Sequence, residues 1–223
     1  MSTAAARPGP RLTTRGRRIA IAVVAAVVLI LMAVSTKYVG AGATVPGAPR
    51  QFDAATYGAK QFPVQQKAIA AAAVEASTLA TELASSDTAT VGKKYGTPVN
   101  SGASYELPVK FTGVVGEVPA AGYTPIKVDG LPAGTQVNVQ LGPAINGTDL
   151  RDFGGKTQLG DFENQIQYQD AATAINDQLK KDVLAKAGSA SALQGKTVTV
   201  TGVFQAVNPK LWNVTPSALQ VQS

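Results

Sequence analysis

The connection over residues 142–160 carries the side chains best suited to chemistry. It is nineteen residues long and contains five glycines, and loops longer than about 12–15 residues in compact domains are often functional. With the residues that follow, it supplies carboxylates, a guanidinium, amides and an aromatic ring, the groups that orient small polar ligands in binding sites. The residues that would form such a ligand-binding site are Asp149, Arg151, Asp152, Asn164, Gln165 and Tyr168.

Four interpretations of this segment remain open. In the structural one, Arg151 pairs with an acid and Asp161 caps the next helix, which leaves no ligand site. In the second, the site binds a neutral polar ligand such as a sugar. An oxygen-ligated Ca²⁺ site is the third, although the Asp spacing lacks the D-x-D-x-D-G order of a calcium loop. The fourth is a pair of carboxylates acting as in a glycosidase.

The composition excludes most familiar catalytic designs. The chain has no Cys and no His. Disulfides, thiol nucleophiles, imidazole bases and zinc sites built from Cys or His are therefore impossible. We expect no catalytic residue, no metal and no cofactor, and hence a protein that is not an enzyme.

The net positive charge of the chain comes entirely from its first 50 residues. The formal net charge is +6, yet residues 51–223 hold thirteen basic and fourteen acidic residues, a net charge of −1. A nucleic-acid surface needs clustered Lys and Arg on the folded body, so we expect no nucleic-acid partner. The early basic residues are Arg7, Arg11, Arg15, Arg17, Arg18, Lys37 and Arg50.

An apolar run over residues 19–34, IAIAVVAAVVLILMAV, explains the basic residues before it. With its flank to residue 39 it approaches the roughly 20 residues that span a bilayer. Arginines on its N-terminal side predict residues 1–18 as a cytoplasmic tail and the rest of the chain as extracytoplasmic. We expect a single-pass anchor in the cell membrane over residues 19–39. The alternative is a signal peptide cleaved after Ala43, although the run exceeds the usual ~7–15-residue signal core.

The exported part divides into a linker over residues 40–50, a helical segment over 51–96 and a strand-rich domain over 97–223. In the helical segment, Pro63 is predicted in a first helical turn, Asp87 near a helix start and Gly96 in a left-handed terminating conformation. Strands are predicted over 105–118, 124–128, 135–141 and 196–207, and around Pro216.

One strong helix is predicted between the third and fourth strands. It begins at Asp161, buries Ile166, Ile175 and Leu179 on one side, and stops at Gly188. Three strands, a helix and two more strands are the chain order of a five-stranded OB-type barrel. We therefore predict an α+β protein: an N-terminal membrane helix, a helical segment and an OB-like barrel. A small open α+β sheet is the alternative.

Several short motifs resemble those of one bacterial family, the domain of unknown function 2291, described as predicted periplasmic lipoproteins. The resemblance covers about residues 50–221. The motifs are Phe52-Asp53-Ala54 with Tyr57, Gly92-Lys93-Lys94-Tyr95-Gly96, Gly142-Pro143, Gly147-Thr148-Asp149-Leu150-Arg151-Asp152, Asp161-Phe162-Glu163-Asn164-Gln165-Ile166, Ala174-Ile175-Asn176, Gly195-Lys196-Thr197-Val198, Gly202-Val203-Phe204, Asn208-Pro209 and Thr215-Pro216.

The resemblance implies an exported protein with a role near sugar uptake, because family members are often encoded beside sugar ABC-transporter components. It supplies no catalytic residues. Since this chain has no lipobox Cys, an uncleaved helix would have to replace the lipid anchor.

We accordingly expect a membrane-anchored, exported accessory or binding module. Its expected partners are the cytoplasmic membrane, through residues 19–39, and a sugar ABC-transporter permease or solute-binding protein. A carboxylate-dependent hydrolase of envelope glycans and a purely structural envelope protein are the alternatives.

Overall fold

The computed structural model describes residues 14–36, 52–120 and 122–222. They belong to two compact units, residues 1–51 and residues 52–223. In the first unit, α1 (Thr14–Ser35) is a 22-residue helix with no buried residue, and its length and composition suffice to cross a membrane. It begins before the predicted span, inside the basic tail. The predicted linker, the end of the span and the Ala43 cleavage site lie outside the described residues.

The second unit opens with the helical segment. It comprises α2 (Ala54–Ala72), the short strand β1 (Val74–Glu75), α3 (Ala76–Ser85) and α4 (Thr88–Tyr95). Asp87 caps α4 by accepting a hydrogen bond from the Thr90 backbone N–H at 2.9 Å. The prediction for Pro63 was wrong, because Asp53 caps α2 far upstream and leaves the proline inside the helix. Gly96 was also wrong: its φ is −109°, extended rather than left-handed, because the chain runs directly into β2 (Thr97–Val99).

Five strands close into a barrel, which confirms the OB-like prediction. They are β3 (Ser104–Val115), β4 (Thr124–Lys127), β5 (Gln136–Val139), β6 (Thr197–Gln205) and β7 (Leu211–Val221). The order is β3-β4-β5-β7-β6, and β6 pairs again with β3 to complete the circle. The β5–β7 pair is parallel and the other pairs of the barrel are antiparallel. The edge of β3 that does not pair with β6 pairs with β1 and β2 as well as with β4.

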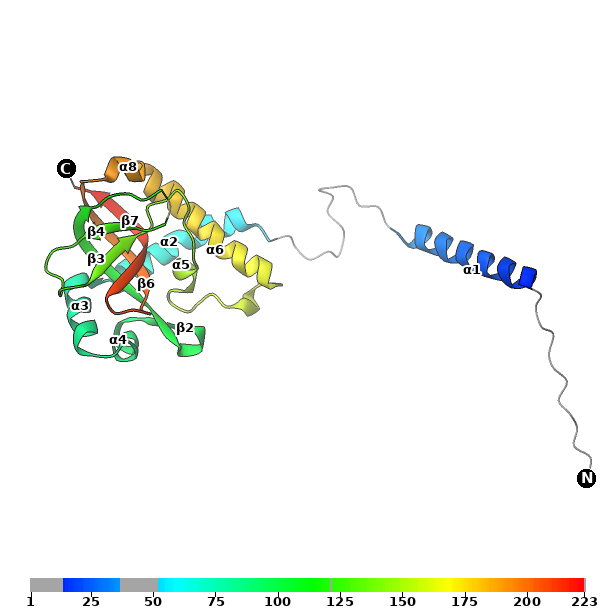
Figure 1. Cartoon of the computed structure of the whole chain (residues 1–223), viewed down its shortest axis with the longest axis horizontal. Helices are drawn as coiled ribbons and strands as arrows, with labels where there is room; N and C mark the ends of the chain where they lie inside the picture. The colour runs from blue at the N-terminus through cyan, green and yellow to red at the C-terminus, as the bar shows by residue number, and fades with distance from the viewer. Residues whose placement is uncertain (1–13, 37–51, 121, 223) are drawn as a thin grey trace, which may run out of the picture. The chain divides into compact units, whose positions relative to one another are not determined.

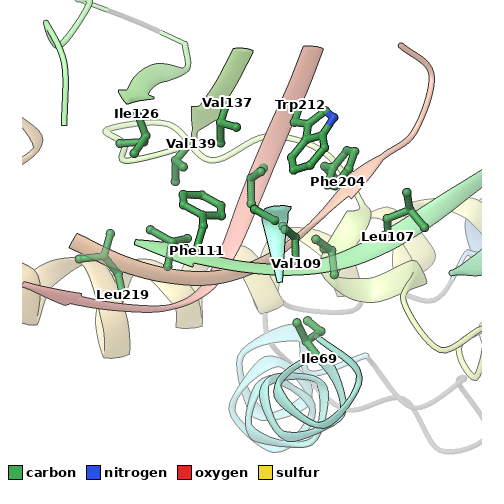
Figure 2. Close-up of a cluster of buried hydrophobic side chains, with 14 of the residues drawn as sticks. Ile69, Leu107, Val109, Phe111, Ile126, Val137, Val139, Phe204, Trp212 and Leu219 are labelled. Atoms are coloured by element: carbon green, nitrogen blue, oxygen red, sulfur yellow. The ribbon is translucent and has the colours of Figure 1, made fainter. Parts of the chain in front are cut away.

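Apolar side chains fill the barrel. Phe111, Val137, Val139 and Trp212 gather between the strands, while Ile69 approaches from α2 outside it (Figure 2). The Phe204 and Trp212 rings stack with centroids 4.8 Å apart. Sharp coiling of the sheet requires Gly202, where β6 shifts register, because a Cβ there would lie 2.5 Å from the Thr215 carbonyl oxygen.

The long connection between β5 and β6 holds most of the helices of the barrel domain. A single helical turn, α5 (Asp149–Asp152), and a 3₁₀ turn (Leu159–Asp161) precede α6 (Gln165–Leu179). A π-helical turn (Lys180–Leu184) and α7 (Ala185–Ala187) continue the helix until Gly188, which stops it as predicted at φ 106°. Then follows α8 (Ala190–Leu193). A further 3₁₀ turn (Asn100–Gly102) separates β2 from β3.

Two details of α6 differ from the prediction. Its cap is Asn164, whose Oδ1 accepts a hydrogen bond from the Gln167 backbone N–H at 2.9 Å, whereas Asp161 accepts one from the Gln158 backbone N–H in the preceding turn. Ile166 is 73% exposed, because the buried stripe of α6 begins only at Ala171.

The helix α6 packs closely on α2. A Cβ at Gly58 of α2 would lie 2.4 Å from the Ala174 carbonyl oxygen of α6, so the two backbones approach where neither carries a large side chain. Figure 1 shows α2, α5 and α6 lying against the barrel, with α3 and α4 near β2. This layer of helices holds the long connection against the strands.

Candidate functional site

The short helix α5 carries three of the predicted site residues. Leu150 of α5 is buried. Just before α5, the Gly147 carbonyl accepts a hydrogen bond from Asn176 Nδ2 of α6 at 3.0 Å. The glycine-rich loop is therefore anchored to the helical layer at this point, and the side chains of α5 have defined directions.

Arg151 is the centre of a buried polar cluster. It is 4% exposed, and its Nε and Nη2 donate to the two carboxylate oxygens of Asp152 at 2.8 and 3.2 Å. Its Nη1 donates to the Tyr168 carbonyl at 2.8 Å, and its Cζ lies 3.5 Å from the Tyr168 ring centroid. Thr148 Oγ1 donates to Asp152 Oδ2 at 2.6 Å. Such a forked and stacked arrangement suits the planar guanidinium.

This cluster forms one wall of a cleft of about 720 Å³, which we call the Arg151 cleft. The facing wall comes from β2 and the turn after it, and the loop after α5 closes one side. Phe52, Tyr57 and Phe162 form an aromatic cluster that contacts the Tyr168 ring through Phe162, and the centroids of neighbouring rings are 5.4–5.7 Å apart. The cleft is lined by Pro98, Val99, Ser101, Gly102, Thr148, Arg151, Asp152, Gly155, Thr157, Gln158, Tyr168 and Gln169.

The predicted site residues divide between different positions. Arg151, Asp152 and Tyr168 line the cleft together. Asn164 serves as the cap of α6, and Gln165 is an exposed residue of its first turn; neither lines the cleft. Asp149 lines a different pocket.

That second pocket has a volume of about 320 Å³. The Oδ2 atom of Asp149 accepts a hydrogen bond from Thr215 Oγ1 of β7 at 2.5 Å, and the same hydroxyl accepts one from Gln140 Nε2 at 2.8 Å. We call this the Asp149 pocket; it is lined by Tyr123, Asp149, Gln205, Val207, Asn208, Leu211 and Asn213.

A third carboxyl near these pockets, Glu106 of β3, was missed in the sequence. It is 2% exposed, and its Oε2 finds no hydrogen-bond partner among the described residues. Burial raises the pKa of Glu106 to about 9, and the negative charges of Asp149 and Asp152 add to the effect. A raised pKa keeps the carboxyl protonated near neutral pH.

The pKa values of two neighbouring groups, Asp149 and Tyr123, are raised as well. Burial raises the pKa of Asp149, and the charge of Asp152 adds to this, while the hydrogen bond from Thr215 opposes it. Burial, followed by the charges of Asp149 and Glu106, also raises the pKa of Tyr123. The region around the Asp149 pocket therefore disfavours further negative charge.

The alternation of side chains along β3 explains why the burial of Glu106 could not be predicted from the sequence. Leu107, Val109 and Phe111 form the apolar face of the strand, which places Glu106 on the opposite, polar face that would normally meet solvent. Farther along this face Lys110 and Thr112 are exposed, whereas Glu106 is buried where β3 pairs with both β2 and β6. No local signal in the sequence reports this difference. Within residues 14–36, 52–120 and 122–222, no three or more acidic side chains are placed so that they could hold a metal ion.

A closed five-stranded barrel with a helix between its third and fourth strands defines an OB-fold protein. A crystal structure of an OB-fold protein from Thermotoga maritima is similar to this chain, with a TM-score of 0.60 and 18% sequence identity; the match covers 78% of this chain and 100% of that one. At this identity, the likeness establishes the fold alone.

The chain belongs to the family described as predicted periplasmic lipoprotein, domain of unknown function 2291, whose model matches residues 22–220. No curated protein matches the chain. Membership of this family and the apolar helix α1 indicate an exported protein associated with the cell envelope.

Proposed function

We propose that this protein is a membrane-anchored extracytoplasmic binding module, not an enzyme, and that the Arg151 cleft binds a small neutral polar ligand such as a sugar. The observation that carries the proposal is the cleft itself. Its volume of about 720 Å³ falls within the usual range of about 300–1,000 Å³ for small-molecule sites.

The charges of the cleft favour a neutral ligand. Each nitrogen of Arg151 donates within the protein, and its charge is balanced by Asp152. An anion would therefore find no free cation there. What the cleft offers instead are hydroxyl and amide groups, including those of Thr157 and Gln169, which match the hydroxyl groups of a sugar.

The cleft is also organised before any ligand arrives. The stacking of Arg151 on Tyr168 and the forked ion pair with Asp152 hold three side chains in fixed positions. Binding then requires little ordering of the protein, which preserves affinity.

A thermal-shift titration of the full-length chain in non-ionic micelles tests this proposal against a panel of mono- and disaccharides. A ligand at about 100 times its Kd should stabilise the fold by about 2.7 kcal/mol. Gln169→Ala, in the cleft, should weaken binding, whereas Gln165→Ala on the same helix but outside the cleft should not. A panel that leaves the melting temperature unchanged would favour the purely structural alternative.

The position of the domain is the second part of the proposal. The arginines before the apolar run support a cytoplasmic N-terminus and an extracytoplasmic barrel domain. Alkaline phosphatase fused after residue 223 should be active and a fluorescent protein fused there should be dark. The reverse pattern would rule out this topology.

The family resemblance supports a sugar ABC-transporter permease or solute-binding protein as partner. Affinity capture from membranes of cells grown on the relevant sugars should enrich such a component. Capture with the Gln169→Ala variant shows whether the partner recognises the occupied cleft. Recovery of no transport component under these conditions would count against the partner.

A carboxylate-dependent glycan hydrolase is the second candidate, favoured by the raised pKa of Asp149 beside the ion-paired Asp152. Acid–base pairs in hydrolases need such a difference in protonation. The two carboxyls line different pockets, however, which argues against joint action on one bond. Cleavage of cell-wall glycan that Asp149→Asn abolishes would reverse this ranking.

A further inference from the structure

The Arg151 cleft lies close to the first described residue of the second unit. This residue, Phe52, packs against Phe162 with ring centroids 5.5 Å apart, and Phe162 packs against Tyr168 at 5.5 Å. The Tyr168 ring in turn has the Arg151 guanidinium 3.5 Å from its centroid. A continuous set of ring contacts therefore joins the start of this unit to the wall of the cleft.

Covalent connection keeps this end of the second unit within reach of α1. Residues 37–51 join α1 to Phe52, and a chain of that length spans at most about 55 Å. The helices α2 and α6 both begin at this end (Figure 1). The continuous helical run over residues 165–187 leads away from it for about 34 Å, and α8 follows beyond its far end. The cleft therefore belongs to the tethered end of the unit.

Exposed aliphatic side chains flank the cleft at this end. Ile166 is 73% exposed and Leu159 is 50% exposed. Ile166 lies three residues before Gln169, which lines the cleft, and residues three apart are neighbours on a helix surface. Leu159 follows Gln158, which also lines the cleft, and its carbonyl accepts a hydrogen bond from the Phe162 backbone N–H at 3.1 Å. Two large apolar groups therefore meet solvent beside a polar cleft.

We propose that the Arg151 cleft binds the sugar headgroup of a neutral membrane glycolipid, while Ile166 and Leu159 contact the lipid surface beside it. This inference rests on the proposed function, for both the sugar-binding cleft and the retained anchor. The hydroxyl and amide groups of the cleft meet the sugar. The aliphatic side chains gain apolar contacts that a free sugar does not offer.

A ligand in the same membrane also compensates for weak binding. Each hydrogen bond between a sugar and the cleft replaces one to water, so its net contribution is modest. When protein and ligand share one bilayer, their encounter becomes effectively intramolecular, and short tethers give effective concentrations of the order of millimolar. A cleft with low affinity for a free sugar can therefore be well occupied by a glycolipid.

The charges at this end favour a neutral lipid. Exposed Asp53 directly follows Phe52. Exposed Asp161 and Glu163 flank Phe162, the ring that packs on Phe52. Negative side chains repel an anionic lipid surface, such as one containing phosphatidylglycerol. Recognition of this lipid should therefore depend on its uncharged sugar.

The full-length chain in lipid nanodiscs tests the proposal. Discs of phosphatidylcholine alone are compared with discs that also contain diglucosyl diacylglycerol, digalactosyl diacylglycerol or phosphatidylglycerol at the same fraction. Thermal unfolding is followed by circular dichroism. We expect a glycolipid to raise the melting temperature by several degrees, and phosphatidylglycerol to leave it unchanged. The free disaccharide headgroup, added to plain discs, should match this shift only at bulk concentrations of about millimolar or above.

Fluorescence locates the contact with lipid. Because the chain has no Cys, Ile166→Cys accepts a single NBD label, and Ala192→Cys places the same label on an exposed residue of α8. Spin-labelled lipids in glycolipid discs should quench the label at position 166 more strongly than the label at position 192.

Three variants separate recognition of the headgroup from contact with the surface. Gln169→Ala alters the cleft and should weaken the response to the glycolipid and to the free disaccharide alike. Ile166→Ser should raise the glycolipid fraction needed for half-maximal stabilisation at least about threefold, and leave the response to free disaccharide unchanged. Val221→Ser, which removes a partly exposed aliphatic group at the end of β7, should change neither. Unchanged melting temperatures in plain discs confirm that the variants are folded.

Stabilisation by free disaccharide without any response to glycolipid discs would overturn this inference and leave the sugar proposal standing. Equal stabilisation by phosphatidylglycerol, equal quenching at the two labelled positions, or a wild-type response of Ile166→Ser would also overturn it. No response to either glycolipid or to any free sugar would reject the sugar proposal as well.

Discussion

Replacing Glu106 with Gln should stabilise the protein, and the gain should increase with pH. The pKa of this carboxyl rises from 4.5 in the unfolded chain to about 9 in the fold. Below pH 4.5 both states are protonated and the group costs nothing. Between the two values, the unfolded state loses its proton and the folded state keeps it, so ionisation favours unfolding by about 1.4 kcal/mol per pH unit. Above about pH 9 the cost becomes constant.

At pH 7 the cost amounts to about 3.5 kcal/mol, from 2.5 pH units at about 1.4 kcal/mol each. The Gln side chain has no proton to lose, and in the folded state it replaces a neutral carboxyl of nearly the same shape. Since 1 kcal/mol shifts the melting temperature of a domain of 150–250 residues by about 2–4 °C, the variant should melt about 7–14 °C higher at pH 7. At pH 4.5 the two proteins should melt at nearly the same temperature.

The assay is thermal unfolding of both full-length proteins in non-ionic micelles, followed by circular dichroism from pH 4.5 to pH 8.5. Asp170→Asn serves as the matched control, because Asp170 is exposed and its neutralisation should give a nearly constant difference. A difference between Glu106→Gln and wild type that does not change with pH would refute the reasoning. It would mean that the buried carboxyl reaches a partner or water and ionises freely.

Three further substitutions test the packing of the site and its supports by thermal denaturation. Arg151→Met should destabilise the protein by about 3–5 kcal/mol because it leaves the Asp152 carboxylate unpaired; adding Asp152→Asn should recover much of this, and a double variant as unstable as the single one would point to lost packing instead. Gly58→Ala should cost about 1–3 kcal/mol, since its Cβ would lie 2.4 Å from a carbonyl oxygen of α6, whereas Gly160→Ala, with open space around it, should be neutral; equal effects would contradict the close helix contact. Asp87→Ala should cost about 1 kcal/mol by removing the cap of α4, and an unchanged melting temperature would show that the cap is dispensable.

The part of the fold that could be predicted from the sequence is the part encoded by local patterns. Alternating apolar residues predicted the five strands, and their order around one long helix predicted the barrel. Asp87 and Gly188 were correct as helix boundaries because capping depends on a few neighbouring residues. The predicted start of the helix at Asp161 was wrong because Asn164, three residues further on, is an equally suitable capping residue. The sequence pattern does not indicate which of the two caps the helix.

The cleft could be predicted in part for a similar reason. Arg151, Asp152 and Tyr168 come from one stretch of chain, and Arg151 reaches its immediate neighbour for its ion pair. Asn164 and Gln165 belong to the same stretch, but Asn164 caps α6 and Gln165 is exposed in its first turn, so neither lines the cleft. The direction of each side chain depends on where α5 and α6 dock, which the order of residues does not specify.

By itself, the sequence determined the apolar helix, the neutral body, the exclusion of Cys and His chemistry and the succession of strands, because each depends on composition or on spacing along the chain. Only the tertiary structure decided that Glu106 is buried beside Asp149, although 43 positions separate them in the chain. Packing around the start of β3 buries Glu106 on a face of the strand whose later residues, Lys110 and Thr112, are exposed. Burial then sets the protonation of the carboxyls, and it is a property of the whole packing rather than of any segment.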